Sequence, residues 1–369
     1  MDHARRHYLD QIRRDGVTLA PAVAKAFGAV PREVFVPDGF YTGDGRRVLP
    51  ADPEFLPTVY SNDVLVTKLT GDVPVSSSSQ PSLMALMIDA LGVQPGMRVL
   101  EIGAGTGYNA ALLATMGAVV TTVDVQPDVA DRARSALARA GIGGVRVETA
   151  DGYTAGPDGR YDRIIVTVGV AGVSPHWLDR LAPGGVIVVP VEHAGTHPVL
   201  AVRNGAEDEV TGAVVCPAGF MSAAGPLTAQ HTGSHPQPTV FAGDLDETAE
   251  QRWDPALDAL AYRDLWYAAG AWHHRVTRAG VPRREQTCFA LVDDSGAAGA
   301  AVLPDGRVLA SGPAAEQYTA VAVALAERWW ALGRPPMRAW RVGLAPGGDP
   351  AAPIRVPRTW TLTRRPDPA

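Results

Sequence analysis

Short apolar runs alternate with segments of helical spacing between residues 97 and 191. The apolar, β-branched runs that predict buried strands are 97–102, 119–125, 145–149, 161–168 and 185–191. The segments between them that predict helices are 106–117, 127–141 and 174–182. Strands that alternate with helices in this way build a parallel sheet with helices on both faces, so the pattern predicts an α/β fold.

The pattern changes on both sides of this region. Residues 1–90 have helical spacing at both ends, and the Pro- and Asp-rich stretch from 37 to 75 is expected to be irregular. Beyond residue 252 the pattern predicts a smaller α+β domain. Its expected helices are 254–280 and 313–332, and its expected strands are 287–294, 299–306, 307–312, 337–344 and 354–363.

A stretch rich in Pro, Gly, Ser, Thr and His separates these two regions, from about residue 217 to 252. Such a composition is typical of a loop or linker. The chain has 369 residues, a length that suggests about two domains. We therefore expect an α/β domain over residues 1–230 and an accessory α+β domain over residues 231–369.

Composition narrows the possible partners. The net charge of −6 argues against a general nucleic-acid binder, which usually has a basic excess. The two cysteines are too few for a disulfide framework or a cysteine-rich metal site. No apolar run reaches the roughly 18 residues of a membrane span, and the first residues lack the apolar stretch of a signal peptide. We expect a cytoplasmic protein, and the sequence leaves its oligomeric state open.

A glycine-rich loop follows the first strand of the α/β region. Residues 99–108 are VLEIGAGTGY, in which a strand leads into Gly103, Gly105 and Gly107 and then into a helix. Glycines let the backbone turn tightly and let a ligand approach without a Cβ in the way. Glu101 precedes the loop and Asp124 ends the next strand, where a carboxylate can accept hydrogen bonds from both ribose hydroxyls of a nucleoside.

Two cofactors use such a layout, and the spacing separates them. Dinucleotide sites use G-x-G-x-x-G, whereas the third glycine here comes one residue early, and Glu101 is a poor neighbour for a pyrophosphate. S-adenosylmethionine has no phosphate, and its cationic sulfonium and ammonium groups favour acidic neighbours. Asp151 follows the third strand, in a position to contact the adenine amino group. The expected cofactor residues of this Rossmann-like methyltransferase sheet are Glu101, Gly103, Ala104, Gly105, Gly107, Asp124, Val125, Asp151 and Gly152.

Residues 1–225 resemble the protein-L-isoaspartate O-methyltransferase family. The segments that carry the resemblance are VPREVFVP (30–37), YSNDVLVT (60–67), SSSSQPSLMALMIDAL (76–91), VLEIGAGTGYNAALLA (99–114), ADGY (150–153) and RYDRIIVTVGV (160–170), followed by LAPGGVIVVPV (181–191). The resemblance implies methylation of an isoaspartyl carboxylate in a protein or peptide, and the ester then loses methanol to give a succinimide. It places Ser79, with Ser78 beside it, at the substrate carboxylate, and it implies substrate contacts from Phe220, Met221 and Ser222. From the residues alone, 76–79 could also be a polar turn or the N-cap of the next helix, an interpretation that is compatible with a role at the substrate.

The chain departs from the family pattern by running on for about 140 residues after the family's motifs end. Together with the SSSSQP variant, this extension resembles methyltransferases that in actinobacteria accompany ribosomally made, modified peptides. That resemblance implies an aspartate of a constrained precursor peptide as the substrate, with aspartimide as the product and peptide recognition by the C-terminal domain. General repair of isoaspartyl proteins is the first alternative, and a non-catalytic peptide-binding module is the second.

Esterification of a carboxylate needs little acid–base machinery. An aspartyl side chain with an ordinary pKa near 4 is already ionised at neutral pH, so the nucleophile needs no general base. The protein has to align oxygen, methyl carbon and sulfur and to exclude water. We expect no metal, because the histidines, His273 and His274 among them, lack paired cysteines or acidic residues at ligand spacing. Most tryptophans of the C-terminal part are expected in its core.

Overall fold

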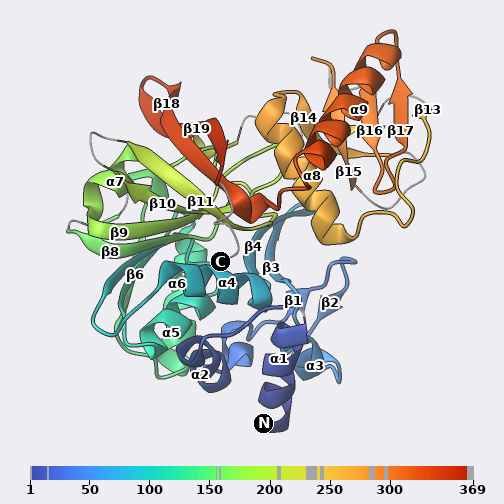
Figure 1. The fold of residues 1–369 in the computed structure, drawn as a ribbon. Helices are drawn as coiled ribbons and strands as arrows, with labels where there is room; N and C mark the ends of the chain where they lie inside the picture. The colour runs from blue at the N-terminus through green and yellow to red at the C-terminus, as the bar shows by residue number, and fades with distance from the viewer. Residues whose placement is uncertain are drawn as a thin grey trace, which may run out of the picture. The chain divides into compact units, whose positions relative to one another are not determined.

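The computed structural model describes residues 2–363 except 15, 155, 158, 206–208, 230–238, 242–244, 282–286 and 295–297. Its contacts divide the chain into two compact units (Figure 1). The first unit comprises Met1–Val168, Ser174–Val189 and Ala201–Ala206, and the second comprises Gly169–Val173, Pro190–Leu200 and Glu207–Ala369. The domain boundary expected between residues 230 and 231 lies outside the described residues.

The first unit contains a parallel sheet in the order β9-β8-β5-β6-β7. Its strands are β5 (Arg98–Ile102), β6 (Val119–Asp124), β7 (Val145–Thr149), β8 (Tyr161–Val166) and β9 (Leu181–Pro190). Helix α4 (Pro81–Leu91) packs against β8, and both α5 (Tyr108–Thr115) and α6 (Pro127–Arg139) pack against β6 and β7 (Figure 1). The unit also contains α7 (Pro175–Arg180) and the short η2 (Gly152–Thr154). The predicted α/β fold class is confirmed.

The residues that flank these helices explain where each one begins or ends. Proline, whose fixed φ suits the first helical turn, opens α4, α6 and α7. The Ser174 side chain caps α7 by accepting from the backbone N–H of His176. Gly92 ends α4 in the left-handed conformation, with φ 64°.

The N-terminal segment contains more regular structure than its sequence predicts. Its elements are α1 (Asp2–Arg14), α2 (Pro21–Ala29), η1 (Arg32–Phe35), β1 (Phe40–Tyr41), β2 (Arg47–Val48), α3 (Phe55–Val59), β3 (Leu65–Thr70) and β4 (Val73–Ser78). The strands form an antiparallel sheet in the order β2-β1-β3-β4. The expectation of an irregular stretch over 37–75 was therefore wrong. Serine has a weak strand preference, but pairing with β3 overrides it and buries alternate residues, Ser76 and Ser78.

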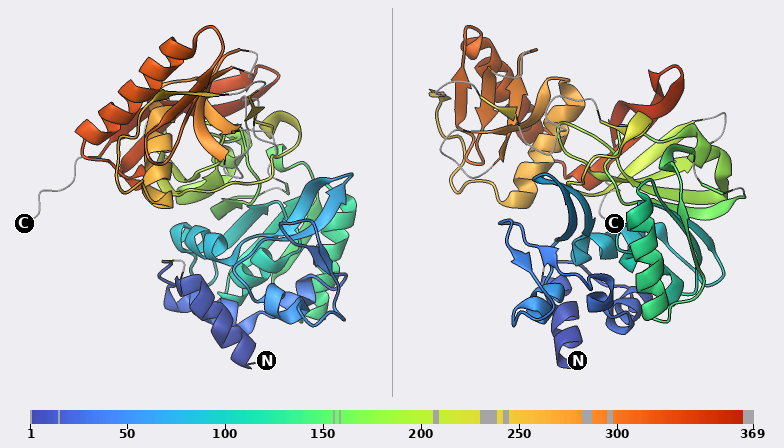
Figure 2. Two further views of the ribbon diagram at one scale, coloured as in Figure 1. Left: turned by 90° about the vertical axis from the view of Figure 1, so that its right-hand side faces the viewer. Right: turned by 180° about the vertical axis from the view of Figure 1, so that it is seen from behind.

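The second unit contains two sets of strands. Strands β11 (Val210–Cys216), β18 (Trp340–Asp349) and β19 (Ala352–Leu362) pair antiparallel in that order. A separate sheet has the order β12-β14-β15-β16-β17-β13, and α9 (Ala315–Ala331) lies along it (Figure 2). These strands are β12 (Thr239–Val240), β13 (Asp246–Ala249), β14 (Val276–Gly280), β15 (Thr287–Val292), β16 (Gly299–Val302) and β17 (Val308–Ser311). The remaining elements are α8 (Ala259–Trp272), η3 (Gly225–Leu227) and η4 (Met337–Ala339), and β10 (Val199–Asn204) spans the division between the units.

One helix of the second unit is shorter than predicted. The sequence pattern predicts a helix over 254–280, but α8 ends at Trp272 and residues 276–280 form β14. The β-branched pair Val276 and Thr277 is fully buried in pairing with β15, which outweighs the helical spacing. The expectation for the tryptophans holds only in part. Trp266, Trp329 and Trp340 are buried, whereas Trp330 is 47% exposed and the other three, Trp253, Trp272 and Trp360, are half-buried.

Candidate active site

The glycine loop, residues 103–107, connects β5 to α5 in the first unit. The backbone N–H groups of Gly103 and Ala104 both donate to the carbonyl oxygen of Val123, at 2.9 and 3.0 Å. Gly103, Gly105 and Gly107 have φ angles of 97°, 51° and 83°, a region that favours glycine. A Cβ on Gly103 would lie 2.7 Å from the Thr167 hydroxyl oxygen. The loop conformation therefore requires glycine both for its dihedral angles and for its close packing.

Asp124 ends β6 and holds the glycine loop. One carboxylate oxygen accepts from the N–H of Gly105 at 3.1 Å, and the other accepts from the N–H of Gln126 at 3.0 Å. Burial raises the pKa of Asp124, and these two backbone hydrogen bonds partly offset that effect. Each carboxylate oxygen keeps a free lone pair, so the group can still accept from ligand hydroxyls as its position in the sequence predicts.

Glu101 is buried within β5, beneath the loop. Its side chain is fully buried, and one oxygen accepts from the Asn109 amide at 2.6 Å. The other oxygen, Oε2, has no hydrogen-bond partner in the part of the chain that the structure describes. Desolvation raises the pKa of Glu101 to about 7, and the nearby negative charge of Asp124 adds to the effect. A buried, unpartnered carboxylate oxygen fits the ammonium of S-adenosylmethionine, because a cation there would compensate the lost hydration.

The other expected cofactor residues lie close by in the first unit. Gly152 packs so tightly that a Cβ on it would lie 2.5 Å from Ile102, the last residue of β5. Asp151 is exposed, and its carboxylate accepts from the N–H of Tyr153 at 2.9 Å, at the start of η2. Val125 is 55% exposed. The carboxyl ends of β5, β6 and β7 thus bring together the residues that the sequence selects.

The serine run lies against the glycine loop. A Cβ on Gly105 would lie 3.2 Å from the carbonyl oxygen of Ser77, so the end of β4 passes directly over the loop. Ser78 is only 2% exposed, and its hydroxyl oxygen accepts from Arg32 Nε at 3.3 Å. Ser79 is half-buried, and its hydroxyl makes no hydrogen bond to a described residue. Of the two serines, Ser79 therefore has the hydroxyl that is free for a ligand.

The alternative interpretation of this run as a helix N-cap does not hold for Ser79. The N-cap of α4 is Gln80, whose side chain makes no capping hydrogen bond. Asn62 instead supports this helix end, since its side-chain oxygen accepts from the N–H of Ser82 at 2.8 Å. Ser76–Ser78 belong to β4 rather than to a turn.

The proposed substrate segment lies in the second unit. Phe220, Met221 and Ser222 are half-buried, and the carbonyl oxygen of Met221 accepts from the N–H of Gly169 at 2.8 Å. The carbonyl oxygen of Gly169 in turn accepts from the N–H of Ala223 at 2.7 Å. The segment is thus held in extended form by residues that follow β8, while Ser79 and the glycine loop belong to the first unit.

Sequence reasoning missed two residues of this site. Asn109, which bonds Glu101, lies just after the loop, and Arg32, which bonds Ser78, lies within VPREVFVP. The sequence signal for Arg32 is an arginine within an otherwise mostly apolar segment, and the structure shows that its neighbours Val30 and Phe35 are buried. Among the described residues, no group of three or more His, Cys, Asp or Glu side chains is placed to hold a metal ion, and no helix is long and apolar enough to cross a membrane.

A parallel sheet with a glycine loop between two carboxylates, Glu101 fully buried and Asp124 partly buried, defines the chain as an S-adenosylmethionine-dependent methyltransferase by fold and site. Residues 3–226 match the family model of protein-L-isoaspartate(D-aspartate) O-methyltransferase, and the chain belongs to this family. The cofactor of the family, S-adenosylmethionine, is the one that the loop and its carboxylates fit.

Relatives with this name are similar over about half of the chain. The protein-L-isoaspartate O-methyltransferase of Thermotoga maritima is 39% identical over 173 residues, which cover 46% of this chain and 50% of that protein. The enzyme of the same name from Gloeobacter violaceus is 37% identical over 183 residues, which cover 49% of this chain and 79% of that protein. A solved structure of a protein-L-isoaspartate O-methyltransferase matches 96% of this chain and 99% of its own, with a TM-score of 0.54 and 24% identity. That structure shares the fold over both units.

We predict that the Asp124→Asn variant binds S-adenosylmethionine about 10- to 100-fold more weakly than the wild type. The substitution removes the charge and one acceptor from a group expected to bind two ribose hydroxyls, and hydrogen bonds to charged groups contribute about 1.5–3 kcal/mol. Isothermal titration calorimetry measures the change. Asp162→Asn is the matched control, because Asp162 also accepts a backbone N–H, that of Arg98 at 2.8 Å, at the other end of the strands. Equal affinity in Asp124→Asn and the wild type would contradict the assignment.

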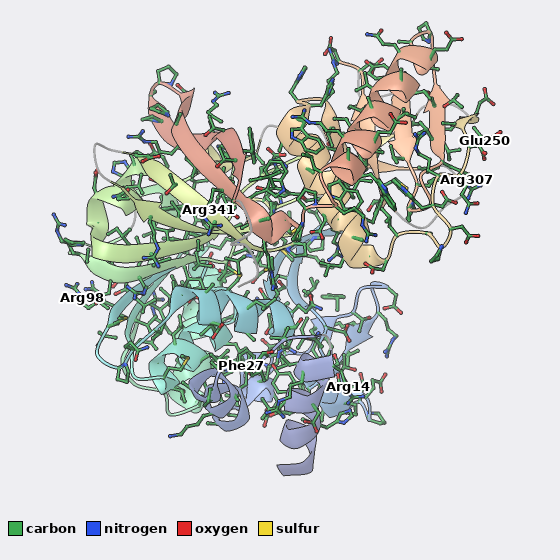
Figure 3. The ribbon with its side chains drawn as sticks, viewed as in Figure 1. Arg14, Phe27, Arg98, Glu250, Arg307 and Arg341 are labelled. Atoms are coloured by element: carbon green, nitrogen blue, oxygen red, sulfur yellow. The ribbon has the colours of Figure 1, made fainter. Side chains whose placement is uncertain are left out.

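A second prediction concerns the raised pKa of Glu101. Its folded-state pKa of about 7 lies above the ordinary value of 4.5, so its contribution to stability is complete below pH 4.5 and is lost as the pH rises through 7. Glu101→Gln stays neutral, so its free energy of unfolding should not fall in this way. We expect the difference in free energy of unfolding between Glu101→Gln and the ligand-free wild type to grow by up to about 3 kcal/mol as the pH rises from 4.5 through 7. Chemical denaturation at pH 5 and pH 7.5 measures this, with the exposed Glu250→Gln as control (Figure 3). Parallel pH profiles for wild type and Glu101→Gln would contradict the burial argument.

Proposed function

We propose that the protein transfers the methyl group of S-adenosylmethionine to the side-chain carboxylate of an L-isoaspartyl residue in proteins and peptides. The observation that carries the proposal is the position of Ser79, whose uncommitted hydroxyl follows a strand that contacts the glycine loop, in a chain that belongs to the isoaspartyl methyltransferase family. This is the first alternative of the sequence analysis, protein repair. A non-catalytic role has no support in a site that keeps its loop and both carboxylates.

The chemistry requires alignment rather than proton transfer. The bound cofactor supplies an electrophilic methyl group; a carboxylate oxygen forms a bond to that carbon while the carbon–sulfur bond breaks. The ionised acceptor carboxylate needs no base. In this protein Glu101 and Asp124 bind the cofactor, and the Ser79 hydroxyl donates to the acceptor carboxylate and orients it. The Phe220–Ser222 segment is proposed to hold the peptide backbone. The methyl ester then loses methanol to the neighbouring backbone amide, which gives a succinimide.

A dedicated, modified precursor peptide with aspartimide as product remains the second candidate. It rests on the extended chain and on SSSSQP at 76–81. The extension alone is weak support, because the solved structure that shares the fold over 96% of this chain also carries the isoaspartyl methyltransferase name. General isoaspartyl substrates are therefore the preferred proposal.

A role of residues 231–369 in peptide recognition is part of either proposal. Within the second unit, Trp253 and Trp330 stack with ring centroids 5.7 Å apart and an interplanar angle of 12°. Trp330 is 47% exposed, and the guanidinium of Arg334 lies 5.1 Å from its ring centroid. Exposed aromatic and arginine side chains are the residue types that bind peptides most strongly, which supports a recognition surface here.

The substrate proposal is tested with three synthetic peptides. They are one with an isoaspartyl residue, its normal aspartyl isomer and a cyclised aspartyl peptide. Mass spectrometry monitors the reaction over time. We expect the isoaspartyl peptide to gain a methyl group and then to lose methanol, and we expect little reaction on the other two peptides. Preference for the cyclised aspartyl peptide would move the assignment to the second candidate. No methylation of any of the three would contradict the proposed function.

We further predict that Ser79→Ala lowers kcat for the isoaspartyl peptide about 10- to 100-fold while the Kd for S-adenosylmethionine stays within about threefold. Loss of one orienting donor costs about 1.4–2.7 kcal/mol in the transition state on this scale. Steady-state kinetics and calorimetry give the two constants. Ser77→Ala is the matched control, a neighbouring half-buried serine of β4. Full turnover in Ser79→Ala would show that the hydroxyl holds nothing in the reaction.

A further inference from the structure

Arg32 is a fully buried arginine whose guanidinium makes hydrogen bonds almost entirely to backbone carbonyls. It is 0% exposed, and the described residues place no carboxylate within ion-pair distance of it. Its guanidinium nitrogens donate to the carbonyl oxygens of Val59 (2.9 Å), Ser61 (3.2 Å), Asp63 (3.0 Å), Ser78 (3.4 Å) and Ser79 (3.0 Å), and to the Ser78 hydroxyl (3.3 Å). The nearest acid in sequence, Glu33, accepts instead from the Tyr60 hydroxyl.

Such an arrangement is costly unless every donor is used. Removing a charge from water without a counter-ion costs several kcal/mol, and hydrogen bonds to oriented carbonyls offset that cost. The planar guanidinium of arginine has donors on three nitrogens and can reach two separate backbone segments, 59–63 and 78–79, at once. Lysine has its three donors on one nitrogen and cannot do so. The residue type at position 32 is therefore fixed by the geometry of the carbonyls around it.

Aromatic rings extend the contacts of Arg32 to the cofactor loop. Its guanidinium carbon lies 6.0 Å from the ring centroid of Tyr8 and 5.8 Å from that of Tyr108. The two tyrosine hydroxyls are 3.3 Å apart, and Phe27, labelled in Figure 3, packs against both rings. Tyr108 is the first residue of α5, directly after Gly107 of the glycine loop. Arg32 thus contacts both the end of the serine strand and the helix that begins at the cofactor loop.

We propose that Arg32 is a positioning residue for methyl transfer, which fixes the backbone of Ser78 and Ser79 relative to the glycine loop and so aims the Ser79 hydroxyl at the acceptor carboxylate. This inference rests on the proposed function. Its basis is the set of three hydrogen bonds from Arg32 to this segment, two to Ser78 and one to the Ser79 carbonyl, together with the contact to Tyr108.

The role is geometric rather than electrostatic. The acceptor carboxylate loses its negative charge as the ester forms, so a cation aimed at it would stabilise the reactants more than the transition state. Arg32 instead directs its N–H donors at backbone carbonyl oxygens. Its charge therefore strengthens hydrogen bonds that hold the backbone in place. Lysine at this position keeps the charge but loses the fork, so the two explanations predict different results for Arg32→Lys.

The experiment compares wild type, Arg32→Lys, Ser79→Ala and the double variant by steady-state methylation of an isoaspartyl peptide. We expect Arg32→Lys to lower kcat about 10- to 30-fold, with the Kd for S-adenosylmethionine within about threefold of the wild type. In the Ser79→Ala background the same substitution should change kcat less than about twofold, because the hydroxyl that it positions is gone. A purely structural role would instead give effects that multiply.

Two further variants keep the test decisive. Arg163→Lys is the matched control, because Arg163 also donates to backbone carbonyls, those of Leu91 and Asp162, away from the glycine loop. Ser78→Ala removes only the acceptor of Arg32 Nε and serves if Arg32→Lys does not fold; we expect a three- to tenfold loss of kcat that also vanishes without Ser79. Multiplying effects, or a loss in Arg163→Lys equal to that in Arg32→Lys, would overturn the inference. A wild type inactive on the isoaspartyl peptide would instead refute the proposed function.

Discussion

The hydrogen bonds between the glycine loop and the end of β6 organise the first unit around its site. Two loop N–H groups converge on the Val123 carbonyl, and a third donates to the Asp124 carboxylate. These hydrogen bonds fix the three glycines of the loop at positive φ angles, which favour glycine. Because Gly105 has no Cβ, the Ser77 carbonyl can approach it closely. One set of contacts therefore holds the glycine loop, the Asp124 carboxylate and the end of β4 in place.

The same unit keeps two carboxylates in places that disfavour their charge. Burial raises the pKa of both Glu101 and Asp124, and the two groups repel each other when ionised. A ligand that brings a sulfonium and an ammonium offsets the cost of holding these carboxylates charged away from water, and this contributes to the affinity for the cofactor. Stability of the ligand-free protein and selectivity for a cationic ligand are thus opposed properties of the same side chains.

Much of the first unit could be predicted from the sequence. The strands of the parallel sheet are apolar and bounded by glycine, so periodicity located β5 to β8 within a few residues, and the spacing of Glu101, the glycines and Asp124 predicted residues that the structure brings together. Tertiary pairing decided what local pattern could not. The serine-rich β4 and the short β14 are strands only because β3 and β15 pair with them. Arg32 escaped notice since its partners are carbonyl oxygens, which carry no sequence signal.

The long sequence separation between β11 and its partner β18 has a consequence for the synthesis of the protein. Val210 of β11 pairs with Leu344 of β18, and β19 then completes the antiparallel set. On the ribosome, β11 emerges long before its partner, and one of its edges keeps unpaired N–H and C=O groups until residues 340–349 have been made. Exposed strand edges of this kind bind other chains, so the nascent protein depends on rapid completion or on chaperones at that stage. A premature stop anywhere before residue 340 would make that exposure permanent.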